Sequence, residues 1–271
     1  MAVRWVDRVP TKANRVLVTP EDGSTPYYAT ITRVDEPSVV GTPVNAANLN
    51  AMQDANGLSA NKTVYVTTTG SDATGDGSQA VPYATVSKAL STIPRNLNGF
   101  IGIVNIGAGI YSENVSIRDY GNGILRITGN AGESVTFPEL IISNVTFAEI
   151  TNISLNLTGS YLNAVGANIR INAPFSASGG AYGIHASYFA NLVFGETVTI
   201  NNTTNYAVVS TAGSRIFINA LSGQGNPVAF RARDGSTISF NSDTSTVTNS
   251  KYLTDTGGRI YTGSQTNTPV N

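Results

Sequence analysis

The segments NIRIN (168–172), NLVFG (191–195), RIFIN (215–219) and TISFN (237–241) share one pattern: two apolar residues flank a third residue, and a turn-forming Asn or Gly follows. Residues two apart lie on the same face of a β-strand, so each segment predicts a strand with one buried face. When the segments are aligned, their first apolar residues form one column, and a second apolar column stands eight residues before it. The columns run Phe147, Ile169, Leu192, Ile216, Ile238, Ile260 and Tyr161, Ile184, Val208, Phe230, Tyr252.

The repeat period decides the fold class. Successive members of each column are 22 to 24 residues apart. This length, with alternating apolar residues, Asn and Gly turns and no helical periodicity, favours the coils of a parallel β-helix over helix-containing solenoids. We therefore expect an all-β protein with about seven coils between residues 100 and 262.

Composition narrows the classes of partner. The chain has 271 residues, 16 basic and 17 acidic, and no run of either charge, so nothing indicates nucleic acid or an anionic membrane as a partner. It has no cysteine, and His185 is the single histidine, so we expect no metal and no cofactor. Residues 1–10 lack the pattern of a signal peptide and no stretch is apolar enough to span a membrane, which predicts a protein made in the cytoplasm, without membrane insertion.

The chain divides into four predicted segments. Residues 1–60 contain short strand candidates and a helix candidate that begins near Thr42. Residues 61–99 contain a strand and an amphipathic helix ended by Pro94, which we expect to cap the open end of the first coil. The β-helix follows in residues 100–262. The tail, 263–271, or a neighbouring subunit must then cover the last coil, and we expect self-association.

Two stretches resemble known families. VYV (64–66), GSD (70–72), GDG (75–77) and PYAT (82–85), followed by VNIGAGIYSENVSI (104–117), resemble the entry segment and first coil of right-handed β-helix proteins of the pectin-lyase-like class. GTPVNAANLNAM (41–52) resembles the amino-terminal attachment region of tail-fibre and baseplate proteins from phages and phage-derived particles.

Together these resemblances imply a homotrimeric tail fibre or tail spike located in a virion or a tail-like particle. Residues 1–60 would attach to the baseplate or other tail proteins, and the right-handed parallel β-helix would point outward to polysaccharide on the host cell surface. The candidate attachment residues are Trp5, Tyr27, Tyr28, Leu49 and Met52.

Carboxylates in the regular repeats are the only candidates for catalysis. Glycosidases use two carboxyl groups that lie about 5 Å or about 6.5 to 9.5 Å apart. Asp234 and Asp255 lie on the same side of adjacent predicted coils, with Arg231, Arg233 and Arg259 near them. Both positions also read as corners, where Asp commonly bonds its own backbone. No acidic cluster recurs on one face, which argues against a Ca²⁺-dependent lyase.

Candidate glycan-binding residues are Tyr182, Tyr188 and Tyr206, which stand among uncharged polar residues of the middle coils. Packing within the solenoid is the alternative role for these rings. We expect a structural and receptor-binding component without enzymatic activity. Two alternatives stay open: a polysaccharide depolymerase whose active site lies between subunits, and a purely architectural baseplate or collar spike.

Overall fold

The computed structural model describes residues 15–18, 27–30, 57–159, 161–263 and 268–269. The chain forms two compact units, residues 1–56 and 57–271. In the first unit, β1 (Arg15–Val18) pairs antiparallel with β2 (Tyr27–Thr30). Tyr27 and Tyr28 lie in β2. The helix predicted near Thr42 and the predicted attachment residues Trp5, Leu49 and Met52 lie outside the described residues.

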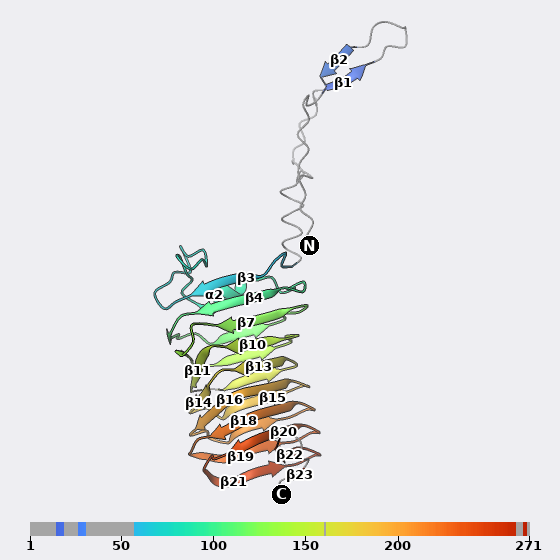
Figure 1. Cartoon of the computed structure of the whole chain (residues 1–271). Coiled ribbons are helices and arrows are strands. Elements are labelled where there is room, and N and C mark those ends of the chain that lie inside the picture. Colours follow the sequence, from blue (N-terminus) through green and yellow to red (C-terminus); the bar gives the residue numbers. More distant parts are fainter. Residues whose placement is uncertain (1–14, 19–26, 31–56, 160, 264–267, 270–271) are drawn as a thin grey trace. The chain divides into compact units, whose positions relative to one another are not determined.

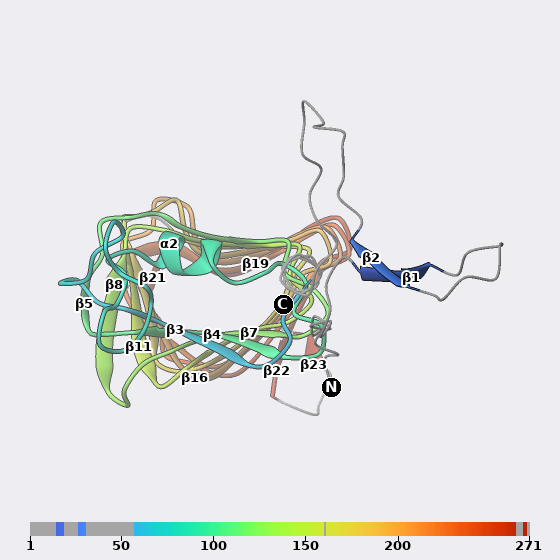
Figure 2. The ribbon, with the colours of Figure 1, turned by 90° about the horizontal axis from the view of Figure 1, so that it is seen from above.

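The second unit is an all-β parallel solenoid of about seven coils. Its strands stack from β3 at one end to β22 at the other, and the coils superpose when viewed along the stack (Figures 1 and 2). Each coil contributes strands to three ladders. The first ladder runs β3 (Lys62–Val66), β4 (Ile101–Ile106), β7 (Ile124–Thr128), β10 (Ala148–Thr151), β13 (Asn168–Asn172), β16 (Asn191–Asn201), β18 (Arg215–Ser222), β20 (Thr237–Asp243), β22 (Arg259–Thr262) and β23 (Thr268–Pro269).

The second ladder runs β5 (Gly109–Ile110), β8 (Glu133–Phe137), β11 (Ile153–Thr158) and β14 (Phe175–Ser178), and continues through the carboxyl halves of β16, β18 and β20. The third runs β6 (Val115–Arg118), β9 (Leu140–Ser143), β12 (Leu162–Val165), β15 (Tyr182–Ser187), β17 (Tyr206–Ser210), β19 (Asn226–Ala232) and β21 (Val247–Thr254). Alternate side chains of all three ladders point inward and form one continuous hydrophobic core.

The predicted apolar columns are confirmed from Ile169 and Ile184 onward, where each member pairs with the next. The first member of each column is wrong by one residue. Ala148, not Phe147, pairs with Ile169, and Leu162, not Tyr161, pairs with Ile184. A shift of one residue moves a side chain to the opposite face of a strand, so the rings of Phe147 and Tyr161 lie partly exposed outside the core.

The predicted capping helix is α2 (Val86–Ser91), which packs against β3, β4 and β6 at the start of the solenoid. Thr85 caps it by accepting a hydrogen bond from the Lys88 amide through its side chain. Val86, Ala89 and Leu90 are buried, and they cover apolar residues that the first coil would otherwise expose. At the other end, β23 pairs antiparallel with β22, so part of the tail covers the last edge of the first ladder.

Candidate functional site

The corner between the third ladder and the next strand of the first ladder repeats one backbone conformation. In four successive coils two adjacent residues there have positive φ angles: Tyr188–Phe189 (53°, 61°), Ala212–Gly213 (49°, 72°), Asp234–Gly235 (56°, 72°) and Thr256–Gly257 (45°, 81°). Backbone bonds join these corners, from the Phe189 amide to the Ala212 carbonyl and from the Gly213 amide to the Asp234 carbonyl, each 3.0 Å long. The four residue pairs are therefore structurally equivalent.

Tyr188 and Phe189, which we call the aromatic corner, differ from the other three pairs of this set. The other three pairs have glycine at the second position, where a positive φ carries no steric cost. A residue with a Cβ atom loses roughly 1–2 kcal/mol in the left-handed conformation. Burial does not offset this loss, since 67% of Tyr188 and 80% of Phe189 is exposed. The fold thus presents two aromatic rings to solvent at a cost in stability.

A cavity of about 320 Å³ lies beside the aromatic corner. Its lining includes Phe189, Gly213 and three polar residues, Asn168, Asn191 and Arg215. Those polar residues occupy one outward-facing row, because Asn168 pairs with Asn191 and Asn191 with Arg215 in adjacent strands. The ring of Phe189 lies close against Gly213, where a Cβ would come within 2.6 Å of the ring. An aromatic surface therefore stands next to amide and guanidinium groups.

The predicted glycan-binding residues Tyr182 and Tyr206 lie on the outer side of the third ladder. Their rings stack on each other with centroids 6.1 Å apart, and the rings of Tyr161 and Tyr182 meet edge to face with centroids 5.4 Å apart. The guanidinium of Arg231 lies 4.8 Å from the centroid of the Tyr206 ring and donates a hydrogen bond to its hydroxyl. Both faces of Tyr206 are thus in contact with neighbouring side chains. Of the three predicted tyrosines, Tyr188 is the most exposed.

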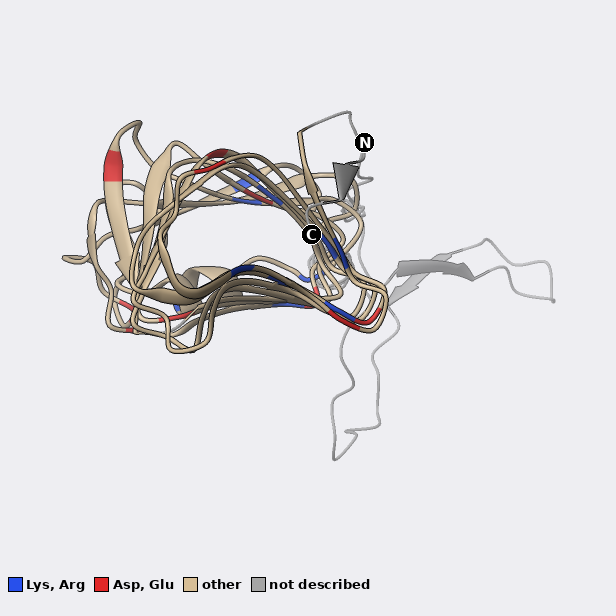
Figure 3. Ribbon diagram, turned by 90° about the horizontal axis from the view of Figure 1, so that it is seen from below, with Lys and Arg blue, Asp and Glu red and all other residues tan. Residues whose placement is uncertain are grey.

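Asp234 and Asp255, the weak catalytic candidates, occupy adjacent coils as predicted from the repeat. The Thr256 hydroxyl lies 2.7 Å from Oδ1 of Asp234 and 3.3 Å from Oδ1 of Asp255. Each carboxylate also pairs with an arginine, Asp255 with Arg231 at 2.8 Å and Asp234 with Arg233 at 3.2 Å. Figure 3 shows acidic and basic segments side by side along this corner.

The chemistry around Asp255 does not favour this residue as a catalytic acid. The hydrogen bond from Arg231 lowers the pKa of Asp255, so its carboxyl is ionised at neutral pH. A glycosidase requires one of its two carboxyl groups to keep a proton, which needs a raised pKa. Asp234 has a positive φ and accepts the Thr256 hydroxyl, as expected of a corner residue. The arrangement is that of two carboxyl groups held in place by arginine and threonine.

His185 lies between the tyrosines and the corner, 5.4 Å from the Tyr182 ring. Burial and the nearby charge of Arg233 lower the pKa of His185 below its usual value. Unfolding raises that pKa to about 6.5, so the unfolded chain binds more protons in the interval between the two values.

We therefore expect the free energy of unfolding to be highest above pH 6.5 and to fall as the pH drops from 6.5 through the pKa of folded His185. A His185→Gln variant should lose this dependence between pH 7 and 5.5, because glutamine does not titrate. Urea unfolding at half-unit pH steps measures both proteins. If the free energies of unfolding of the two proteins change with pH in parallel, His185 does not cause the pH dependence of stability in this interval.

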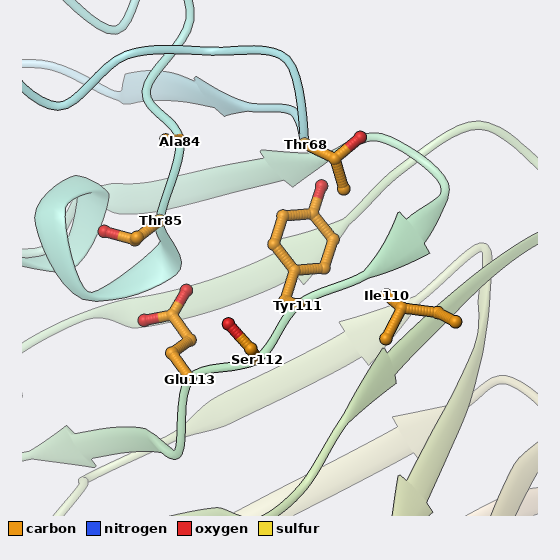
Figure 4. A pocket seen from close by; sticks show the side chains of 7 residues that line it. All are labelled: Thr68, Ala84, Thr85, Ile110, Tyr111, Ser112 and Glu113. Carbon is orange, nitrogen blue, oxygen red and sulfur yellow. The ribbon is translucent and has the colours of Figure 1, made fainter.

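A second cavity, of about 250 Å³, lies near α2, and its lining includes residues 110–113 (Figure 4). These residues belong to a Gly-x-Tyr-x-Glu motif at positions 109–113. The Glu113 carboxylate accepts hydrogen bonds from the backbone amides of Val86 and Ser87 at the start of α2. The Tyr111 hydroxyl donates to the Gly107 carbonyl at 2.8 Å. Glu113 thus joins the cap to the first coil, while Tyr111 closes the turn that follows β4, so both side chains make structural contacts.

Comparison with protein families, with curated proteins and with solved structures finds no match for this chain. In the described part of the chain, no three His, Asp or Glu side chains gather in a way that would bind a metal ion. The same residues include no helix long and apolar enough to cross a membrane.

Four residues of the candidate site are not among those predicted from the sequence: Phe189, Asn168, Asn191 and Arg215. The repeat itself carries the signal for the first of them. Tyr188–Phe189, Ala212–Gly213, Asp234–Gly235 and Thr256–Gly257 each begin four residues before a member of the first apolar column. Aligned on that column, an aromatic pair stands where the following coils have a small or polar residue and glycine.

Proposed function

We propose that this chain is a structural and receptor-binding component of a phage tail or a tail-derived particle. It binds polysaccharide on the host cell surface through the side of the β-solenoid that carries the aromatic corner, and it does not cleave that polysaccharide. The observation that carries this proposal is the exposure of Tyr188 and Phe189 on a strained backbone beside a polar cavity. Strain retained at exposed side chains is typical of functional sites.

The chemistry of the corner suits a saccharide. A flat ring with a free face accommodates the C–H face of a pyranose, and amide and guanidinium groups bind its hydroxyls. Asn168, Asn191 and Arg215 supply such groups at the spacing of adjacent strands, about 4.8 Å. A β-solenoid holds this row rigidly, so little conformational entropy is lost on binding.

Attachment and assembly follow from the resemblance of residues 41–52 to tail-fibre and baseplate proteins. We propose that residues 1–60 join the chain to the particle and that three copies assemble. A single shallow site binds a sugar weakly. Several sites on one particle raise the overall affinity through their effective concentration.

The proposal is tested by passing the purified full-length chain over immobilised bacterial capsular polysaccharides and lipopolysaccharide O-chains, while the eluate is assayed for reducing and unsaturated sugar ends. We expect retention on at least one polysaccharide and no release of ends. Retention on none of them would overturn receptor binding and favour the architectural spike.

Release of sugar ends would instead favour the depolymerase, for which the shared contact of Asp234 and Asp255 with Thr256 is the supporting observation. The double variant Asp234→Asn/Asp255→Asn is the matched test of that outcome. End release that disappears in this variant, with retention intact, would assign catalysis to these carboxylates and contradict our proposal.

A further inference from the structure

Arginines around the aromatic corner are not all neutralised. Arg231 and Arg233 pair with Asp255 and Asp234. Arg215 and Arg259 are exposed and form no ion pair with any described residue. In this row of the first ladder Arg215 pairs with Thr237 and Thr237 with Arg259, so the two free guanidinium groups are two strands apart. The corner therefore carries a local excess of positive charge.

Only one of these two free arginines lines the cavity. Arg215 shares it with the ring of Phe189, while Arg259 lies outside it. The side-chain amide of Asn191, next to Arg215 in the row, makes no hydrogen bond with any described residue. Asn168 donates its amide to the Thr146 carbonyl at 3.0 Å, which leaves its side-chain oxygen available as an acceptor.

From these observations we infer that the cavity beside Phe189 binds an acidic sugar, such as a uronic or sialic acid, whose carboxylate pairs with Arg215. This inference rests on the proposed function and adds the chemical class of the ligand. The planar guanidinium forms two parallel hydrogen bonds with a carboxylate, a geometry that a hydroxyl group does not satisfy. Phe189 contacts the apolar face of the pyranose, and Asn191 and Asn168 bind its hydroxyls. A cavity of about 320 Å³ is at the small end for a ligand site and suits one sugar residue.

The test is a ligand-observed NMR titration of the full-length chain with sodium glucuronate, sodium galacturonate and N-acetylneuraminate, each up to 100 mM. Glucose and galactose are the neutral counterparts of the two uronates and the neutral reference sugars for N-acetylneuraminate, and sodium acetate supplies the carboxylate without a sugar ring. We expect at least one acidic sugar to bind at least tenfold more tightly than its neutral counterpart and than acetate. Added NaCl should weaken that binding, because salt screens an exposed charge pair.

The Arg215→Gln variant should lose at least tenfold in affinity for the acidic sugar and should lose less for the neutral counterpart, because the glutamine amide still forms a hydrogen bond with a hydroxyl group. Arg259→Gln is the matched control, since it removes a free guanidinium of the same row that does not line the cavity, and we expect less than a twofold change. Equal binding of acidic and neutral sugars, unchanged affinity in Arg215→Gln, equal binding of acetate, or no binding of any acidic sugar would each overturn the inference.

The outcomes separate this inference from the proposed function. If retention on a bacterial polysaccharide persists in Arg215→Gln, the result supports the receptor-binding proposal and contradicts the assignment of an acidic sugar to the cavity. If an acidic sugar binds through Arg215 but no bacterial polysaccharide retains the chain, the result supports the assignment of the cavity and contradicts the receptor-binding proposal.

Discussion

The double variant Tyr188→Asn/Phe189→Gly is expected to have a free energy of unfolding about 1–2 kcal/mol higher than that of the natural protein. It is also expected to lose at least tenfold in affinity for the retained polysaccharide. Asparagine and glycine both tolerate the left-handed conformation that positions 188 and 189 adopt, so the change relieves backbone strain. Little burial is lost, because both natural side chains are mostly exposed.

The informative result is a gain in stability together with a loss of affinity. Urea unfolding gives the first quantity, and retention on immobilised polysaccharide gives the second. A loss of stability would mean that the two rings stabilise the solenoid and would remove the main argument for a functional corner. Unchanged affinity would place the saccharide elsewhere.

Two controls isolate the cause of each effect. Ala212→Asn introduces asparagine at the equivalent left-handed position of the next coil, and we expect a gain of a few tenths of a kcal/mol without a change in affinity. Ile110→Ser removes an apolar side chain with the same exposed fraction as Phe189, 80%, close to the other cavity. Retention that falls in this variant would indicate nonspecific adhesion of exposed apolar groups.

Much of the solenoid was predictable because its stacked coils impose one constraint repeatedly. The inward residues of the two columns pair with inward residues one coil away, so the columns keep their register from Ile169 and Ile184 onward. Phe147 and Tyr161 show where this reasoning fails. Each lies next to a smaller or equally apolar residue, Ala148 or Leu162, and apolarity alone does not decide which of two neighbours points inward.

The candidate site was harder to predict because it depends on backbone conformation. Periodicity places Tyr188 and Phe189 at a corner but does not show that both adopt positive φ angles, which turn their rings toward solvent. The stacking of Tyr182 on Tyr206 does follow from the repeat, since each stands two residues before a member of the second column, Ile184 or Val208. Considered one at a time, these tyrosines are equivalent to Tyr188, because all three stand among uncharged polar residues.

Stability of the later coils depends on a polar residue inside the solenoid, Asn226. It is fully buried at the start of β19. Its Oδ1 accepts hydrogen bonds from the Thr203 amide at 3.1 Å and the Thr203 hydroxyl at 3.0 Å, and its Nδ2 donates to the Ile200 carbonyl at 2.7 Å. One side chain thus satisfies three polar groups of the preceding coil.

Replacing Asn226 with alanine is therefore expected to lower the free energy of unfolding by about 2–5 kcal/mol, since each buried group left without a partner costs about 1–3 kcal/mol. Asn241→Ala is the matched control. Asn241 is exposed and donates one bond, to Oδ1 of Asn219 at 3.0 Å, so its loss should cost less than about 0.5 kcal/mol. Equal effects of the two substitutions in urea unfolding would show that the buried hydrogen bonds of Asn226 contribute no more to stability than the exposed hydrogen bond of Asn241.

Asn226→Asp separates the loss of hydrogen bonds from the loss of side-chain volume. Ionised aspartate accepts from Thr203 but donates nothing to the Ile200 carbonyl, and it places a charge in the core. Burial raises the pKa of this carboxyl above its unfolded value of about 3.9, so the folded chain binds the extra proton. Stability relative to the natural protein should then recover as the pH falls through the raised pKa, because a protonated carboxyl donates to Ile200 again. A deficit that stays constant from pH 7 to 4.5 would contradict the hydrogen-bonding role assigned to Asn226.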